Sequence, residues 1–410
     1  MSGFVEEARS IDDCLSFVAE GLGFPWNVRR RTASVADALF SRSSIDIRAP
    51  EPYPPFTRSL RDGYALDHSN TVGASASAPV FLRLAGEVLM GSAPSFKLAQ
   101  DEAASIPTGG MLPENADSVV MAENTITAGD WIEIRSSVQS GENIIRAAEE
   151  IAEGDILLRK GEIIDKSAPG LLAAFGISSV SVMDIRIGII STGDEILPIG
   201  TSPLPMGFIR DSNTLIIQSV LSKYGLPSTS YGIVPDIWES LDLCAEKAIH
   251  DCDVVLLSGG SSVGARDHTA RLIDSLSIPG LLARGINMTP GKPTIIGGSI
   301  GDRKLFIGLP GHPLSCMVAV LFVVLPLIGA MCGAGCGTAG KYCMLPLAED
   351  VSGRSGSDEF IPVRVDAKGA HPLAAKSGYV SAMRRADGFI RLRPDTETLR
   401  KRETAEVWLW

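Results

Sequence analysis

The chain has 410 residues, which exceeds the length of one ordinary hydrophobic core and indicates about two to four domains. Hydrophobic residues make up 45% and charged residues 21%, proportions that are normal for a globular protein and exclude wholesale disorder. The 37 Lys and Arg residues against 48 Asp and Glu residues give a net charge of −11. This argues against a nucleic acid partner, because such binding neutralises phosphates with cations.

The N-terminus and the cysteines favour a cytoplasmic location. The first twenty residues, MSGFVEEARSIDDCLSFVAE, contain early acids and lack the pattern of a secretory signal. The 7 Cys residues are odd in number and scattered, which suits a reducing compartment. The run MVAVLFVVLPLIGAM (317–331) is apolar enough to suggest a membrane span. Because Pro326 interrupts it and no basic or aromatic anchors flank its start, we expect a buried helix and no membrane partner.

The first 182 residues predict helices, then short strands, then a further helix. IDDCLSFVAEGL and SVADALFSRS have apolar residues at helical spacing, and Ser34 suits the N-cap of the second helix. Short apolar segments separated by Gly, Pro and Asn predict an inserted β-rich domain over 51–140. Residues 1–50 and 141–182 form a split helical and strand domain, with a helix from Ser167 to Phe175 that ends at Gly176.

From residue 185 the pattern changes to strands that alternate with helices. IRIGIIST, DVVLLSGG, PTIIGGS and KLFIGLPG are expected strands, and NTLIIQSVLSKYG, IWESLDLCAEKAIHDC and HTARLIDSLS are expected helices. Such alternation predicts an α/β domain over 183–332 with a mostly parallel, helix-covered sheet. After a Gly-rich linker, residues 340–410 are again strand-like. The predicted fold class is therefore multidomain, α/β plus β.

Four loops that follow expected strands share one style and define the candidate ligand site. They are STGDE (191–195), SGGSSVGARDHT (258–269), MTPGKP (288–293) and LPGHP (309–313). Ligands bind at the carboxyl ends of parallel strands, and Gly, Ser and exposed N–H groups form anion nests. We therefore expect a phosphorylated ligand at these residues: Ser191, Thr192, Gly193, Asp194, Ser258, Gly259, Gly260, Ser261, Ser262, Gly264, Lys292, Pro293, Pro310, Gly311, His312 and Pro313.

Carboxylates in and between these loops indicate a divalent cation. Asp194, Glu195, Asp211 and Asp267 are interleaved with the expected phosphate site. Mg²⁺ binds one or two carboxylates together with phosphate oxygens, so it is the expected metal. The few histidines are not paired at metal-ligand spacing, which argues against zinc.

Other patterns are weaker. GINMTPGKP resembles a P-loop, but Pro293 stands where Ser or Thr should bind Mg²⁺. Gly260 to Gly264 fit the nucleophile elbow of serine hydrolases, with Ser262 as nucleophile and Asp302 and His312 in triad order, although this leaves the other loops unexplained. A cluster of thiols surrounds the Gly-rich linker, where a flexible connector is favoured over a metal or redox site: Cys332, Cys336 and Cys343.

In their order, the motifs resemble the molybdopterin molybdotransferase family, which includes bacterial MoeA and the gephyrin E domain. The resemblance covers nearly the whole chain. It rests on PPFTRSLRDGYA, PTGGMLPENADSVV, STGDE with RDSNTLI, SGGSSVGARDHT, PGKP and GLPGHPLS. It implies four domains, of which 183–332 binds molybdopterin and 340–410 is a C-terminal β-barrel. It also implies homodimers whose active cleft joins the α/β domain of one subunit to the inserted domain of the other.

The resemblance further implies a reaction and residue roles. Family members take adenylylated molybdopterin and molybdate, release AMP in the presence of Mg²⁺, and leave the metal on the dithiolene. Glu195, Asp211 and Asp267 match family acids that position Mg²⁺. Asp62 and Thr108, which alone look like ordinary turn residues, match catalytic positions of the inserted domain, and Ser377 lies in a recognisable family segment that contacts substrate. Other proteins of molybdenum cofactor biosynthesis are expected partners.

Several positions depart from the family pattern. Thr289 stands where a Lys or Arg usually precedes PGKP, His312 replaces an Asn, and Pro362 replaces the Arg of EF-x-R. Arg364 lies two residues further on, which on a strand is the same face. Lost basic charge should weaken anion binding. It leaves a second hypothesis, a non-catalytic pterin-binding dimer or a paralogue that prefers tungstate.

Overall fold

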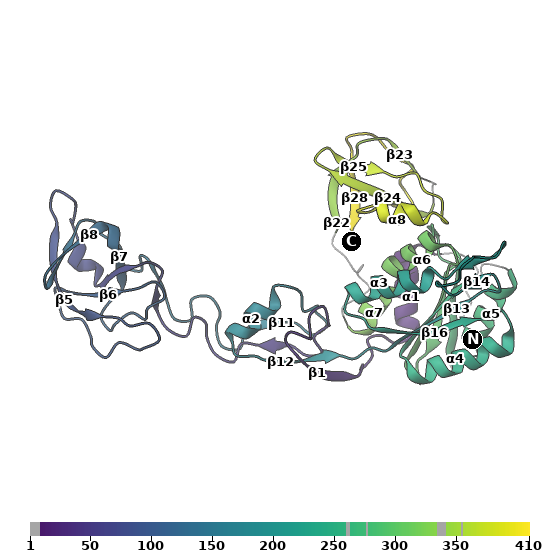
Figure 1. Cartoon of the computed structure of the whole chain (residues 1–410), viewed down its shortest axis with the longest axis horizontal. Helices are drawn as coiled ribbons and strands as arrows, with labels where there is room; N and C mark the ends of the chain where they lie inside the picture. Colours follow the sequence, from purple (N-terminus) through teal and green to yellow (C-terminus); the bar gives the residue numbers. More distant parts are fainter. Residues whose placement is uncertain (1–8, 260–262, 276–277, 334–341, 354–355) are drawn as a thin grey trace. The chain divides into compact units, whose positions relative to one another are not determined.

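The computed structural model describes residues 9–259, 263–275, 278–333, 342–353 and 356–410, without the side chains of 263–267. The chain divides into two compact units, which Figure 1 shows with their elements labelled. Unit 1 contains Met1–Ile45, Arg159–Pro169 and Ser178–Trp410, and unit 2 contains Asp46–Leu158 and Gly170–Ile177. The expected multidomain organisation of α/β and β parts is confirmed. Its division into four domains stays a prediction.

A mixed sheet forms the centre of unit 1. Within the described residues its strand order is β16-β13-β17-β21-β20-β18. The pairs from β16 to β21 are parallel, whereas β21–β20 and β20–β18 are antiparallel. β20 and β21 are joined by a short turn without a helix, and such a turn joins only antiparallel strands. The strands are β13 (Ile187–Thr192), β16 (Ser228–Val234), β17 (Val254–Gly259), β18 (Pro279–Arg284), β20 (Ile295–Ser299) and β21 (Lys304–Leu309).

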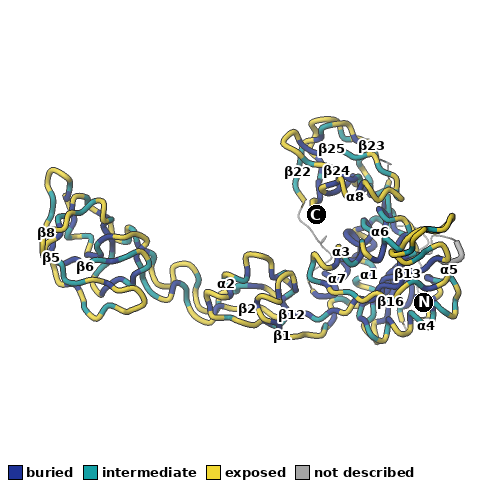
Figure 2. The backbone as a smooth tube through the Cα atoms, in the orientation of Figure 1, coloured by how far each residue is buried: buried dark blue, intermediate teal, exposed yellow. Residues whose placement is uncertain are grey.

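Helices cover both faces of this sheet. Alternate strand residues enter separate cores: Val254 and Leu256 lie in one, and Val255 and Leu257 in the other. The strands β13, β17, β20 and β21 and the helix that follows β21 are largely buried, whereas β16 is mostly exposed or half-buried (Figure 2). The helices of the α/β part of unit 1 are α1 (Ile11–Gly21), α3 (Asn213–Lys223), α4 (Trp238–Asp251), α5 (Val263–Asp274), α6 (Pro313–Ala319) and α7 (Leu325–Met331), with a π-helical turn, Val320–Val324, between the last two.

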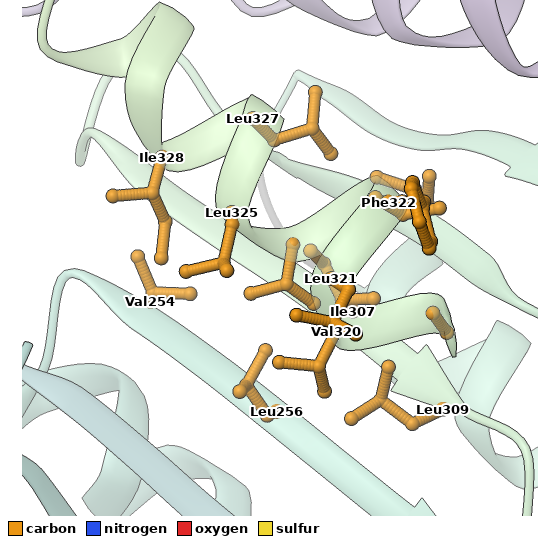
Figure 3. Packing of buried hydrophobic residues seen from close by; sticks show 14 of the residues in the cluster. Val254, Leu256, Ile307, Leu309, Val320, Leu321, Phe322, Leu325, Leu327 and Ile328 are labelled. Carbon is orange, nitrogen blue, oxygen red and sulfur yellow. The ribbon is translucent and has the colours of Figure 1, made fainter. Parts of the chain in front are cut away.

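The apolar helix that runs from Pro313 to Met331 is a core element. It is long and apolar enough to cross a membrane, yet its apolar window is 100% buried inside the structure. Its side chains pack on the sheet residues Val254, Leu256 and Ile307 (Figure 3). The expectation of a buried helix is confirmed.

The C-terminal strands form a second sheet that includes a piece of the α/β region. Its order is β19-β24-β26-β28-β22, with β25 paired to β24. An isolated bridge between Leu347 and Ala370 brings the residue after β22 towards β25, but closure into a barrel stays a prediction. The elements are β19 (Met288–Thr289), β22 (Tyr342–Pro346), β24 (Asp358–Asp366), β25 (Gly369–Pro372), β26 (Gly388–Leu392), β28 (Thr404–Leu409), the pair β23 (Val351–Ser352) and β27 (Thr398–Leu399), and α8 (Val380–Arg385).

Aromatic and ionic contacts attach this sheet to the helices of unit 1. Phe322 stacks on Phe360 with ring centroids 4.1 Å apart and lies edge-on to Trp408 at 5.7 Å. The buried Arg391 pairs with the buried Asp358 at 2.8 Å and with Asp12 of α1 at 3.1 Å. The C-terminal sheet therefore shares its core with the α/β part.

Unit 2 is built on the inserted β-rich segment. Its main sheet has the order β7-β4-β6-β5-β9-β8 within the described residues. The elements are β4 (Gly63–Leu66), β5 (Val80–Glu87), β6 (Glu102–Ile106), β7 (Ser118–Met121), β8 (Thr125–Ala128), β9 (Trp131–Ile134), the short pairs β2 (Ile47–Arg48) with β11 (Ile156–Leu158) and β3 (Arg58–Ser59) with β10 (Ile144–Ile145), and the 3-10 turns η1 (His68–Thr71) and η2 (Ala122–Asn124).

The helix expected from Ser34 is wrong, and the helix expected from Ser167 is present with slightly different bounds. Ser34 ends β1 (Arg30–Ser34), which pairs with β12 (Ser179–Met183), and the following residues form turns in which Phe40 has a positive φ of 65°. A helix cannot continue through that conformation. The helix expected from Ser167 is present as α2 (Ala168–Ala174), with Gly176 at a φ of 68°. Two short strands, β14 (Ile196–Leu197) and β15 (Ile209–Arg210), pair in parallel after β13.

Candidate functional site

The loops predicted from sequence do meet at one edge of the unit 1 sheet. β13, β17 and β21 are parallel neighbours, so Thr192, Gly259 and Leu309 end at the same edge. Gly259 has a φ of 119°, and a Cβ there would lie 1.8 Å from the carbonyl oxygen of Thr192. Only glycine fits this close approach of two strand ends.

Asn213, the first residue of α3, connects this helix to two of these loops. Its Nδ2 donates to Ser258 Oγ at 3.0 Å and to the carbonyl oxygen of Gly311 at 2.9 Å. Within the described residues, the buried oxygens Asn213 Oδ1 and Ser191 Oγ have no hydrogen-bond partner. Sequence reasoning missed Asn213, although it lies in the RDSNTLI segment on which the family resemblance rests.

A cavity of about 340 Å³ lies beside this edge, and we call it the anion cavity. Among the described residues that line it there is no carboxylate, and Lys292 and His312 are its basic side chains. The structure thus brings together Gly259, Lys292, Pro293, Pro310, Gly311, His312 and Ser377 of the predicted site, with Thr269, Met288, Thr289, Pro290, Gly291, Ile295, Gly308, Leu309 and Ser315 added. Pro313 follows directly as the first residue of α6.

Local hydrogen bonds fix the cavity walls. Thr294 is fully buried, and its hydroxyl donates to the carbonyl oxygen of Gly291 at 2.7 Å, which closes the 288–293 loop. Ser377 Oγ lies 3.3 Å from His312 Nδ1, and the Ser377 carbonyl oxygen accepts from the Leu314 N–H at 3.0 Å. The C-terminal segment therefore forms one wall. Its sequence distance from the loops hides this contact from pattern analysis.

Of the predicted acids, Asp194, Glu195 and Asp211 are absent from the described lining of the anion cavity. The carboxylate of Asp194 accepts from the Asp236 N–H at 3.1 Å, and Asp236 in turn accepts from the Thr192 hydroxyl at 2.5 Å. Glu195 is exposed just before β14. Both oxygens of Asp211 accept from Thr214, its hydroxyl at 2.7 Å and its N–H at 3.1 Å. Asp211 therefore caps the first turn of α3. The remaining lone pairs of its carboxylate are available to a ligand.

Part of the predicted site lies outside the described residues. Gly260, Ser261 and Ser262 are in that group, and for Gly264 and Asp267 only the backbone of α5 is described. The serine hydrolase alternative is nonetheless wrong. Asp302 precedes β21 and His312 follows it, and a strand of this length separates them by about 20 Å. Two members of the supposed triad therefore cannot meet.

Asp62 and Thr108 meet in unit 2. Asp62 Oδ1 accepts from the Thr108 N–H at 2.7 Å. Hydrogen bonds from the Thr108 backbone and side chain hold the pKa of the exposed Asp62 carboxyl below its usual 3.8. The two turn residues thus form one polar unit with an ionised carboxylate at neutral pH.

A different group in unit 2 has ligand atoms close enough for a metal. Among the described residues, Asp67, His68 and Asp117 place one ligand atom each within 4.8 Å of one another. Their contacts are those of a folded turn: Asp117 accepts from the His68 N–H at 2.8 Å and lies 2.7 Å from its ring Nδ1, and Asp67 caps η1. We assign this group a structural role.

Two of the three thiols near the linker, Cys332 and Cys343, lie within the described residues. Burial raises the pKa of the Cys332 thiol to about 11, so it stays protonated at neutral pH. Cys343 Sγ lies 3.7 Å from the Val407 carbonyl oxygen within the C-terminal sheet. Cys336 is outside the described residues. The connector interpretation of this linker therefore stays a prediction.

The residues that depart from the family pattern line the anion cavity or a second cavity that shares residues with it. Thr289 lines the anion cavity and also a second cavity of about 410 Å³, which Pro362 lines. Arg364 is exposed and, within the described residues, lines neither cavity. It therefore does not replace an arginine at position 362.

Three family models match consecutive parts of the chain. The MoeA N-terminal region (domain I and II) matches residues 5–176. The probable molybdopterin binding domain matches residues 188–330, and the MoeA C-terminal region (domain IV) matches residues 344–410. Together the matches include the anion cavity and the Asp62–Thr108 pair.

Relatives agree over almost the full length. A molybdopterin biosynthesis protein of Methanocaldococcus jannaschii is 32% identical over 93% of both chains. A Staphylococcus aureus protein named molybdopterin molybdenumtransferase is 30% identical over 85% of this chain and 82% of its own. The crystal structure of the molybdopterin biosynthesis MoeA protein from Pyrococcus horikoshii is 34% identical, covers 98% of this chain and 99% of its own, and has a TM-score of 0.75. The chain therefore belongs to the MoeA family of molybdopterin molybdenumtransferases.

Proposed function

We propose that this chain inserts molybdate into adenylylated molybdopterin, with Mg²⁺-dependent release of AMP. The anion cavity carries this proposal. It combines Lys292, His312, the Ser377 hydroxyl and glycine backbone, and it lacks carboxylates among its described lining residues. Such a set of donors suits a tetrahedral oxyanion or a phosphate. The reaction class comes from the names of the curated relatives.

We propose Glu195, Asp211 and Asp267 as the residues that hold Mg²⁺. Carboxylate oxygens are the ligands this cation prefers. Glu195 is exposed, and the two hydrogen bonds from Thr214 fix the orientation of the Asp211 carboxylate. When bound, Mg²⁺ would neutralise charge on the departing AMP. The metal and its ligand set rest on the family resemblance and on this donor chemistry.

We propose that Asp62 and Thr108 complete the site from the second subunit of a homodimer. The ionised Asp62 carboxylate and the Thr108 hydroxyl lie together in exposed turns of unit 2, where a substrate can reach them. Homodimer formation, a cytoplasmic location and contacts with other proteins of cofactor synthesis stay predictions. The non-catalytic scaffold is not favoured, because the curated relatives are named transferases and the acids are retained.

The test is AMP release by the purified full-length chain from adenylylated molybdopterin, on addition of molybdate and Mg²⁺, repeated with tungstate. We expect release that requires both the oxyanion and the cation. Lys292→Ala should weaken it, whereas Lys223→Ala, on the far end of α3, should not. Tight binding of the adenylate without release of AMP would contradict the transferase proposal and favour the non-catalytic scaffold.

A further inference from the structure

Two side chains of different chemistry can supply positive charge to the anion cavity. Among the described lining residues, Lys292 and His312 supply the basic groups. An ammonium group keeps its charge at neutral pH, whereas histidine changes charge between about pH 5 and pH 8. The cavity therefore carries one fixed cation and one switchable cation.

His312 is exposed and has neighbours on two segments of the chain. It is the N-cap of α6, the start of a helix that continues to Met331. Its Nδ1 lies 3.3 Å from Ser377 Oγ, and a Cβ on Gly378 would lie 3.8 Å from its Cδ2. The ring thus lies between its own loop and the 377–378 segment, on the wall of the cavity.

Protonation of this ring changes two groups at once. Both ring nitrogens of the imidazolium are donors, so Nδ1–H donates to Ser377 Oγ. The Ser377 hydroxyl hydrogen is then free to point at an anion in the cavity, which both side chains line. In the neutral ring with its hydrogen on Nε2, Nδ1 is an acceptor and takes that hydrogen instead. One proton therefore adds a charge and redirects a hydroxyl donor.

The charged groups on the surrounding elements do not reproduce this switch. Lys292 lies on the facing loop, and Lys376 and Tyr379 flank the Ser377 segment. Arg384 and Arg385 end α8, and Asp211 precedes α3 and is held by Thr214. A second imidazole, that of His268, is next in sequence to the lining residue Thr269, and its ring contacts Trp238 with centroids 5.9 Å apart.

We propose that His312 is a binding residue of the anion cavity and makes binding of a divalent tetrahedral oxyanion there dependent on pH. The proposal deepens the proposed function, because it concerns the oxyanion of that same site. Since the anion binds the protonated form more tightly, affinity is highest at low pH and falls as the pH rises through the range in which histidine loses its proton. A change of about tenfold between about pH 6 and about pH 8.5 is expected.

The experiment is calorimetric titration of the full-length protein with molybdate and, separately, with sulfate, which keeps its charge across this range. His312→Asn should bind weakly at every pH, as the neutral ring does. His312→Lys should bind tightly at every pH, because its cation is permanent. His268→Asn should keep the pH dependence of the unaltered protein. Circular dichroism checks that each variant is folded.

The outcomes separate this inference from the proposed function. Loss of pH dependence in both His312 variants, with its retention in His268→Asn, supports the switch whether or not AMP is released. Full pH dependence in His312→Asn overturns it. Absence of oxyanion binding at any pH also overturns it, even where the AMP assay succeeds.

Discussion

Asn213 Nδ2 donates to Ser258 Oγ at 3.0 Å and to the Gly311 carbonyl oxygen at 2.9 Å, so one amide joins α3 to the ends of two strands. The two acceptors belong to loops that sequence analysis assigned to the ligand. The shape of that edge therefore depends on a residue that lines no described part of the anion cavity.

We predict that Asn213→Ala lowers the free energy of unfolding by about 1–3 kcal/mol, because it leaves the buried Ser258 hydroxyl and the half-buried Gly311 carbonyl oxygen without their donor. It should also weaken molybdate binding, since Gly311 adjoins His312. Urea unfolding and calorimetry measure the two effects. Ser219→Ala, at an exposed position of the same helix, is the control and should change stability by less than about 0.5 kcal/mol. Normal oxyanion binding in Asn213→Ala would show that the amide does not position the loops.

The buried pair of Arg391 and Asp358 provides a second prediction. Arg391→Met leaves the fully buried Asp358 carboxylate without its partner and should cost about 3–5 kcal/mol. Adding Asp358→Leu should recover most of that loss, because it removes the unpaired charge. Arg393→Ala, whose side chain is half exposed, should cost at most about 1 kcal/mol. Equal losses in the two arginine variants would contradict the importance of burial.

Because burial raises the pKa of two thiols, we predict that the protein becomes less stable at high pH. Burial raises the pKa of Cys14 and of Cys332 from the usual 9.0 to about 11. Their contribution is fully present below the unfolded value and is lost as the pH rises from about 9 to about 11. Urea unfolding at both ends of this window should show the decline, and Cys14→Ala should make it shallower. At about pH 8, iodoacetamide should label neither thiol in the folded protein.

We predict that the Asp62 carboxyl has a pKa below its usual 3.8. The Thr108 N–H is the largest cause of its lowered pKa, and the Thr108 hydroxyl adds to it. Thr108→Ala keeps the N–H, so the pKa should rise only partly towards the usual 3.8, as followed by the carboxyl carbon shift in NMR. The stability that the hydrogen bonds provide is present above the unfolded value and is lost as the pH falls through the folded one. A carboxyl that titrates at its usual value would contradict the contact.

Local patterns predicted the elements whose cause is local. α1, α3, α4 and the buried strands β13, β17 and β21 lie where apolar periodicity and turn residues put them. The Gly-rich loops after these strands were recognised from their composition. They were expected to lie together because parallel strands end at one edge of a sheet. The Ser34 helix failed, because the preceding residues pair with β12 and Phe40 adopts a positive φ. Pairing with a distant strand overrode the local preference.

The remaining parts of the site depend on long-range contacts. Ser377 was identified through the family motif, and its place against His312 is set by how the C-terminal sheet packs on α6. Nothing in the spacing of Asp194, Glu195 and Asp211 predicted that they would be absent from the described lining of the anion cavity. Phe322, in a run that could have been a membrane segment, is buried by aromatic rings more than thirty residues away in sequence.

β19 is a strand of the C-terminal sheet, although it belongs to the loop that carries Lys292. Met288 and Thr289 pair with Asp358 and Glu359, and Asp358 is itself held by Arg391. Exchange of residues 342–410 with those of a relative would therefore replace the backbone on which this loop rests. The C-terminal segment and the loop should therefore come from the same parent protein in a chimera. Such a chimera should bind oxyanion better than one that takes the two parts from different parents.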